Sequence, residues 1–286
     1  MKAKEYAQSL KQYTVMTEEM GRYYDTGRAN YSWCDYKIPT EVAAIEALKS
    51  ITHEDQTTIN EMLRWLLQEK RTQTWDTPIN SVDAVYAFLL GNLSVLSGQD
   101  QTVLAIDGKK LESPTATAGI GYVKSAVQPT SKMKTLTAKK TSTGTSWGAV
   151  YAQFMINTSD ISQSYSGITL EREIIRKGDL KVGDKVKVRL TITSDRDYDF
   201  VQVIDKRAAC MEPVNQLSGY HWGYYSAPKD CSTNYYFDNL SKGKHVIETE
   251  YYIDRSGRYN TGTCTVQCVY SPEYRATEKS ETIEVK

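Results

Sequence analysis

The hydrophobic pattern of this chain changes its period once, and that change limits the folds that the chain can adopt. Up to about residue 97, apolar residues recur every three to four positions, which is the spacing of amphipathic helices. From residue 167 onward they alternate with polar residues, most strictly at Val186, Val188, Leu190 and Ile192, which is typical of half-buried strands. Helices followed by strands favour separate domains over an alternating α/β sheet. We therefore predict an α+β multidomain chain.

Four amphipathic helices joined by short connections are predicted in residues 1–97, and we expect them to pack as antiparallel hairpins. The first covers about residues 6–20, the second opens at Thr40 just after Pro39, and the third covers residues 54–70. The fourth begins at Thr77-Pro78, a capping residue followed by proline at the first helical position. The predicted apolar stripes are Val42, Ile45 and Leu48 in the second helix, Ile59, Met62, Leu63, Leu66 and Leu67 in the third, and Ile79, Val82, Tyr86, Leu89, Leu90 and Leu93 in the fourth.

Residues 98–166 are rich in threonine, serine and glycine, and we predict a small β-rich linking domain there. Residues 103–106 lead into Asp107-Gly108, which is a hairpin-turn signal, and residues 149–156 are a second candidate strand. The stretch is too short for a rich core of its own, so it is expected to depend on its neighbours.

Residues 167–286 are predicted to form an antiparallel β-sandwich of roughly seven strands. Strands are expected at residues 199–205, 245–253, 259–270 and 282–285, besides the one around Leu190. Lys242-Gly243-Lys244 and Arg255-Ser256-Gly257 are the expected turns.

Charge and cysteine content exclude several classes of protein. Lys plus Arg and Asp plus Glu both number 35, so the chain lacks the basic excess that binds nucleic acid. The sequence contains no stretch of about 18 apolar residues, so it predicts no membrane-spanning helix. The five cysteines, Cys34, Cys210, Cys231, Cys264 and Cys268, contain no C-x-x-C pair, which argues against a zinc ribbon or a redox motif. Cys264 and Cys268 would lie ~13 Å apart on one strand, at ~3.3 Å per residue, too far to bond each other.

The sequence also lacks the motifs of common enzyme active sites. Only three histidines occur, none of them in an H-E-x-x-H helix, and there is no G-x-S-x-G elbow or phosphate-binding loop. Cys34 has no histidine near it in sequence and is interpreted as a packing thiol rather than a nucleophile. The acidic residues Glu18, Glu19, Asp35, Asp76 and Asp83 lie near helix ends, where the helix dipole alone explains them. We therefore predict no enzyme activity, no cofactor and no metal site.

The most distinctive surface feature is aromatic. Residues 220–225 and 235–237 are dense in tyrosine and tryptophan, and the first group falls in the turn-rich stretch 215–234. Aromatic side chains on a supported loop commonly form a binding face, although they can also fold back into a satellite core. The candidate interaction surface is Tyr220, His221, Trp222, Tyr224 and Tyr225.

Several segments, taken in order, resemble the alpha-2-macroglobulin family, and its large bacterial members in particular. Residues 63–67 (LRWLL) with 75–85, and 38–48 before them, are similar to the last hairpins of the thioester-bearing helical domain, an α/α toroid. Residues 146–154 (SWGAVYAQF) resemble the strand that returns from this toroid to the β domain that carries it. Residues 178–184, 205–213, 237–243 and 270–273 resemble the C-terminal macroglobulin-like sandwich.

The resemblance implies a C-terminal fragment of a protease-trapping protein of the periplasm, cell envelope or extracellular side, with the signal sequence upstream of this fragment. Proteases would be met through the full-length parent, and another envelope protein is a possible partner. In the family, a bait region is cut and a C-x-E-Q thioester captures the protease. This chain has neither; its nearest match is Cys210-Met211-Glu212-Pro213, where proline replaces the glutamine. No membrane insertion by this segment is expected. A guess that Cys210 pairs with Cys268 stays open alongside other pairings.

Two other classes of function compete with this one. A polysaccharide-active enzyme would combine a toroid with a sandwich, and it predicts turnover of polyanionic glycans by carboxylates in a cleft. A glycan-binding or adhesion module would use the aromatic segment, and it predicts that Trp222 fluorescence responds to glycans.

Overall fold

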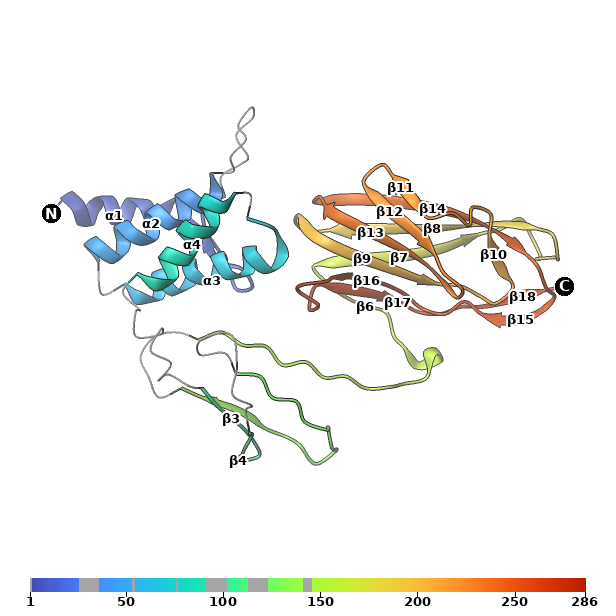
Figure 1. Ribbon diagram of the computed structural model, residues 1–286, viewed down its shortest axis with the longest axis horizontal. Coiled ribbons are helices and arrows are strands. Elements are labelled where there is room, and N and C mark those ends of the chain that lie inside the picture. The colour runs from blue at the N-terminus through green and yellow to red at the C-terminus, as the bar shows by residue number, and fades with distance from the viewer. Residues whose placement is uncertain are drawn as a thin grey trace. The chain divides into compact units, whose positions relative to one another are not determined.

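The computed structural model describes residues 2–25, 36–52, 55–75, 77–90, 102–112, 123–140 and 146–286. The chain divides into two compact units, Met1–Gln68 with Trp75–Phe154, and Glu69–Thr74 with Met155–Lys286. The first unit is mainly helical and the second contains a large antiparallel sheet, so the predicted α+β class is confirmed (Figure 1). The finer division at residues 97 and 166 stays a prediction. None of the described helices is long and apolar enough to cross a lipid bilayer.

The helices of the first unit are α1 (Lys2–Gln12), α2 (Lys37–Ile51), α3 (Gln56–Thr72) and α4 (Pro78–Leu89). As predicted, Thr77 caps α4, because its side chain accepts a hydrogen bond from Asn80 N at 3.1 Å. Helix α2 begins three residues before Thr40, since Pro39 is tolerated in a first turn that needs no N–H donor. The residues that form the shared core are Ala7, Met20, Ile38, Val42, Ala44, Ile45, Leu48, Ile59, Met62, Leu63, Trp65, Leu66, Ala84 and Ala87.

Two predictions for this unit were wrong. The first helix ends at Gln12, and a short hairpin follows, formed by β1 (Val15–Thr17) and β2 (Gly21–Tyr23). Helix α4 presents its small residues Ala84 and Ala87 to the core, while Ile79, on the predicted stripe, is 71% exposed. Because α4 is apolar on several sides, periodicity could not select the buried face, and the small alanines allow α2 to approach closely.

The small β-rich stretch forms a three-stranded sheet in the order β4-β3-β5, made of β4 (Lys109–Lys110), β3 (Val103–Ile106) and β5 (Leu136–Lys139). Asp107 and Gly108 connect β3 to β4 with φ of 48° and 80°, so the predicted hairpin turn is confirmed. Residues 149–156 form no strand, contrary to prediction, because a run of apolar residues does not by itself supply a strand to pair with.

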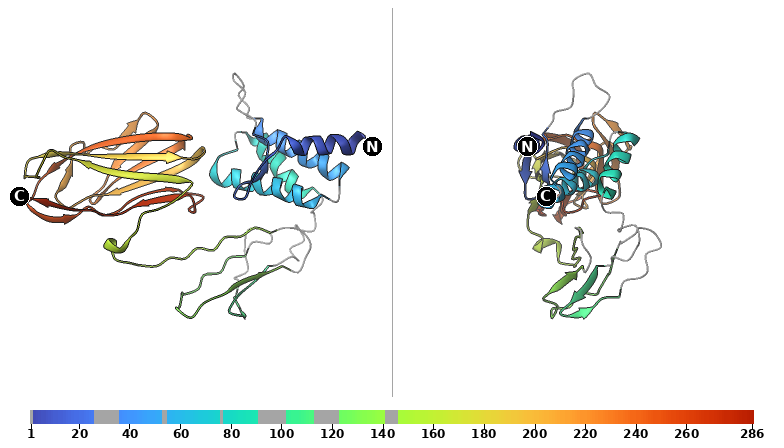
Figure 2. Two further views of the ribbon diagram at one scale, coloured as in Figure 1. Left: turned by 180° about the vertical axis from the view of Figure 1, so that it is seen from behind. Right: turned by 90° about the vertical axis from the view of Figure 1, so that its left-hand side faces the viewer.

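The second unit is a β-sandwich of two layers (Figures 1 and 2). We name the layers by their central strands. The β8 layer has the order β10-β14-β8-β7, and the β9 layer has the order β17-β16-β9-β13-β12-β11. Strand β6 pairs with both β17 and β7 and thereby joins the layers. The bounds are β6 (Ser164–Ser166), β7 (Ile168–Ile175), β8 (Lys185–Ser194), β9 (Tyr198–Lys206), β10 (Met211–Pro213), β11 (Gly219–His221), β12 (Tyr224–Pro228), β13 (Ser232–Leu240), β14 (Gly243–Ile253), β15 (Gly257–Asn260), β16 (Cys264–Cys268), β17 (Arg275–Glu278) and β18 (Thr282–Val285).

Within residues 167–286, twelve strands (β7 to β18) thus replace the roughly seven that were predicted, although the strongly patterned ones are confirmed. Val186, Val188, Leu190 and Ile192 all point into the core, as their alternation predicts. The predicted strand 259–270 is instead two strands, β15 and β16, interrupted at residues 261–263. Gly167 forms the corner between β6 and β7 with φ of 69°, and a Cβ there would clash with Tyr198 Oη.

Candidate functional site

The predicted aromatic surface is a hairpin of β11 and β12 at the free edge of the β9 layer. His221 and Tyr224 are paired across it, and Trp222-Gly223 forms the two-residue turn, in which Gly223 has φ of 90°. The stretch 215–234 is therefore ordered β structure for much of its length, rather than only a loop. Its five candidate residues divide between the two faces of the sheet, because side chains alternate along each strand.

Tyr220 and Trp222 are presented to solvent, with 82% and 100% of their surface exposed. The Tyr220 ring meets Tyr225, its partner across the hairpin, at 4.8 Å between centroids. The fully exposed Trp222 ring buries no apolar surface in the folded chain, so it is available to a ligand or partner.

Tyr224 and His221 instead support the hairpin. The Tyr224 ring packs against the core residues Tyr235 and Phe237 at 5.8 and 5.5 Å between centroids. His221 stacks on Tyr224 at 5.0 Å, and its Nε2 lies 3.0 Å from Ser226 Oγ. Burial raises the pKa of the Tyr224 hydroxyl. Of the five predicted residues, these two hold the exposed rings in place.

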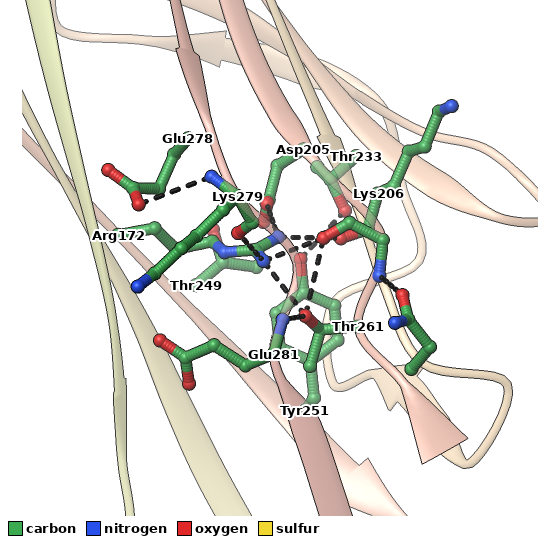
Figure 3. Close-up of polar contacts among 12 residues, drawn as sticks. Arg172, Asp205, Lys206, Thr233, Thr249, Tyr251, Thr261, Glu278, Lys279 and Glu281 are labelled. Carbon is green, nitrogen blue, oxygen red and sulfur yellow. Dashed lines mark hydrogen bonds and ion pairs between the residues drawn. The ribbon is translucent and has the colours of Figure 1, made fainter. Parts of the chain in front are cut away.

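A buried ion pair that the sequence did not suggest links the two layers of the sandwich (Figure 3). Arg172 on β7 points inward, where the alternation with Ile168 and Leu170 predicts an apolar residue. Its Nη1 donates to Asp205 Oδ1 on β9 at 3.1 Å, and the two side chains are only 3% and 1% exposed. The sequence did contain a usable signal for this pair, since a charged residue at an inward position of an alternating strand needs a buried partner.

The Arg172 guanidinium also binds three backbone carbonyls. It donates to Lys206 O at 3.1 Å, Gly262 O at 2.7 Å and Lys279 O at 3.2 Å. A fifth hydrogen bond runs to Thr261 Oγ1 at 2.8 Å. These acceptors lie in segments far apart in sequence, so one side chain fixes the ends of several strands and the break between β15 and β16.

The pKa shifts in this cluster are those of groups that are buried away from water. Burial raises the pKa of Asp205, and the neighbouring Arg172 acts in the opposite direction. Burial, helped by the charge of Asp205, raises the pKa of the Cys264 thiol well above its usual range. Beside the pair, Thr233 and Tyr251 share a hydrogen bond of 2.9 Å, and Tyr235 and Thr249 share one of 2.6 Å. A satisfied, water-excluded network of this kind stabilises a fold and does not offer a reactive group to a substrate.

The other sequence candidates do not converge. Within the described parts of the chain, no group of three His, Cys, Asp or Glu side chains could hold a metal ion. Glu18 and Glu19 lie between β1 and β2, and Asp83 lies on α4. Cys34, Asp35 and Asp76 lie outside the described residues.

The guess that Cys210 pairs with Cys268 was wrong, because both are free thiols in the structure. Cys268 lies opposite Val201 on β9 and donates from Sγ to Asp199 O at 3.5 Å. Cys210 lies beyond the other end of β9, after Lys206. Opposite ends of one strand are too far apart for a disulfide.

The class of protein that this geometry defines is a two-layer antiparallel β-sandwich, attached to a helical unit and stabilised by a buried inter-layer ion pair. Residues 157–273 match the family model of the bacterial alpha-2-macroglobulin MG10 domain. This match confirms the resemblance of the chain to the alpha-2-macroglobulin family.

Solved structures of bacterial alpha-2-macroglobulins are similar to the chain at low identity. The trypsin-activated protein from Escherichia coli is 12% identical over 87% of this chain and 18% of its own, with a TM-score of 0.46. The same protein activated by porcine elastase is 13% identical over 87% and 24%, again at 0.46. The Salmonella protein reacted with methylamine is 17% identical over 89% and 17%, at 0.41. This chain thus spans less than a quarter of their length. No curated protein sequence matches it.

Proposed function

We propose that this chain is the non-catalytic C-terminal region of a bacterial alpha-2-macroglobulin-like protein that traps proteases. The observation that supports this most is the match of residues 157–273 to the MG10 domain, a domain of that family. The E. coli protein with a similar structure has been activated by trypsin and by elastase, so proteases of this kind are the proposed targets of the full-length parent. The proposed location is the periplasm, the cell envelope or the extracellular side.

The proposed role of the sandwich is that of a rigid element. The Arg172–Asp205 pair, with its three backbone carbonyls, fixes the two layers against each other. A rigid domain can transmit a rearrangement as a body instead of absorbing it by deforming. Covalent capture is not part of the proposal, because residues 210–213 lack the glutamine that a thioester needs.

The exposed rings of the β11–β12 hairpin are the surface that we propose contacts a partner or ligand. Tyr220 and Trp222 supply the contact area, while His221 and Tyr224 position them and Tyr225 extends the surface along the sheet. Rings held by a rigid hairpin lose little conformational entropy when they bind.

The test uses the full-length parent. It is incubated with active trypsin and, as the control, with trypsin whose catalytic serine has been blocked. Trapping predicts that only active trypsin is retained through size-exclusion chromatography and that the hydrodynamic radius of the parent changes. If active trypsin elutes separately and the radius stays constant, the trapping function is refuted.

A glycan-binding function is the second candidate, because Trp222 is fully exposed on a supported hairpin. Its test is a change in Trp222 fluorescence on addition of glycan.

A further inference from the structure

The outer face of the β9 layer carries one continuous row of side chains that crosses six strands. Strand pairing places Tyr220 opposite Tyr225, Tyr225 opposite Tyr236, and Tyr236 opposite Gln202. The row continues from Gln202 to Gln267 and from Gln267 to Arg275. Directly paired residues project from the same face, so three tyrosines and two glutamines stand side by side. At ~4.8 Å between strands, the row is ~24 Å long.

The middle of this face is almost uncharged, while the exposed Lys206 on β9 and Asp238 on β13 lie outside it on the same face. The row beside the first one consists of Ala227, Asn234, Ile204, Thr265 and Thr277, linked by the same strand pairs. Together the two rows contain one charged side chain, Arg275, at the margin away from the aromatic hairpin. Asn234 Nδ2 donates to Tyr236 Oη at 3.3 Å, so the tyrosine ring is oriented by an amide of the neighbouring row.

The outer face of the β8 layer is the opposite in character. Lys187 and Arg189 on β8 donate to Glu248 on β14 at 2.9 and 2.8 Å, and Arg189 also pairs with Glu173 on β7 at 3.4 Å. Networks of ion pairs of this kind are typical of a solvent-exposed strand face. Depletion of charge is therefore specific to these two rows and is no general property of the outer faces of the sandwich.

From this contrast we infer that the row from Tyr220 to Arg275 is a binding site for an uncharged polysaccharide. Tyrosine rings offer apolar faces to the C–H faces of pyranose rings, as they do to other apolar groups. Glutamine and asparagine amides both donate and accept hydrogen bonds, which suits hydroxyl groups that also do both. A neutral ligand needs no counter-charge, and a flat, extended site spanning several strands fits a polymer better than a small molecule.

Trp222 lies beside the Tyr220 end of the row, two residues further along the hairpin in the turn that follows His221, and it is fully exposed. A ligand bound over Tyr220 is therefore expected to come close to it. The tryptophan therefore reports occupancy of the site, while Tyr236 and Gln202 form its centre and Gln267 lies next to Gln202.

The test is affinity electrophoresis of the complete 286-residue chain in native gels that contain xyloglucan, laminarin or dextran. Gels with polygalacturonate supply the anionic comparison. The variants are Tyr236→Ala and Gln267→Ala in the row, with Val246→Ala as the matched control, since Val246 lies on the outer face of β14 in the other layer and is 51% exposed. Circular dichroism verifies that each variant is folded; Gln267→Ala, which removes no ring, tests the site even if Tyr236→Ala does not fold.

We expect at least one neutral polysaccharide to retard the chain and to change Trp222 fluorescence. Tyr236→Ala should weaken binding about tenfold or more, as expected for a central aromatic contact, and Val246→Ala should leave it unchanged. The inference is overturned if no neutral polysaccharide retards the chain, if only polygalacturonate does, or if Val246→Ala weakens binding as much as Tyr236→Ala. It is also overturned if the chain instead self-associates through the row, seen as a dimer in sedimentation that Tyr236→Ala abolishes.

This inference does not rest on protease trapping. The parent can retain trypsin while the chain fails to bind any polysaccharide, and the reverse outcome is equally distinct.

Discussion

Removing the Arg172 guanidinium tests whether one buried ion pair holds the sandwich together. Arg172→Met keeps much of the aliphatic stem but abolishes all five hydrogen bonds of the side chain. Asp205, which is 1% exposed, then loses its ion-pair partner in the interior. Breaking a buried pair in this way costs roughly 3–5 kcal/mol, because the remaining charge is left without compensation.

The matched control is Arg189→Met. Arg189 lies on the adjacent strand β8 and also pairs with two carboxylates, but its side chain is 42% exposed on the outer face. Exposed pairs of this kind contribute about 0–1 kcal/mol. The two variants change the same residue type in the same sandwich, so the difference between them isolates burial.

Urea unfolding followed by near-ultraviolet circular dichroism is the suitable assay, since the fully buried tyrosines of the sandwich (Tyr198, Tyr235, Tyr251 and Tyr274) contribute to this signal. With a slope of roughly 1–3 kcal/mol per molar urea, Arg172→Met should lower the midpoint of the sandwich transition by about 2 M. Arg189→Met should lower it by about 0.5 M or less. The double variant Arg172→Met with Asp205→Leu should recover more than about 1 kcal/mol relative to the sum of the single changes. Equal midpoints for the two arginine variants, or strict additivity in the double variant, would refute the reasoning.

Three further predictions follow from the described contacts. Gly167→Ala should destabilise the sandwich by about 3 kcal/mol or more in the same urea assay, because a Cβ there meets Tyr198; Gly178→Ala, with similar φ but open space, should cost only about 1 kcal/mol, and equal costs would contradict the clash. Burial raises the pKa of Tyr235 in the folded chain, so folding stability is fully present below the ordinary tyrosine pKa and should fall above pH 10 by about 1.4 kcal/mol per pH unit for this group. Tyr235→Phe should reduce that dependence without abolishing it, because burial also raises the pKa of Tyr198 and Tyr251, and full ionisation of the tyrosines near pH 10 without unfolding, measured by absorbance at 295 nm, would contradict it. Trp222→Ala should change the melting temperature by less than about 2 °C, whereas Tyr224→Ala, which removes a ring packed on the core, should lower it clearly; a large loss for Trp222→Ala would show that its ring is structural.

The aromatic segment illustrates how far a single sequence can lead. Composition identified Tyr220 and Trp222 as residues of a candidate surface, and both are exposed. The sequence did not separate them from Tyr224, which packs on the core, because hydrophobicity does not show which face of a hairpin is covered. Nor did it suggest Gln202 and Gln267, since their place beside the tyrosines depends on the register of strands far apart in the chain.

Local signals determined the elements that local physics controls. The 3.6-residue period predicted the helix that spans residues 56–72, Thr77-Pro78 predicted the start of α4, and Asp107-Gly108 predicted a hairpin. Strict alternation predicted the central strand β8, and the order of helices before strands predicted the α+β class. Each of these follows from the geometry of a few consecutive residues.

Tertiary structure alone decided which faces meet. It turned Ala84 and Ala87 of α4 toward the core instead of the larger Ile79. It brought Arg172 on β7 to Asp205 on β9 across the sandwich, and it kept Cys210 and Cys268 at opposite ends of β9. These outcomes depend on pairings between segments tens of residues apart, where the burial of a charge or the size of a side chain decides among packings that the sequence pattern leaves equivalent.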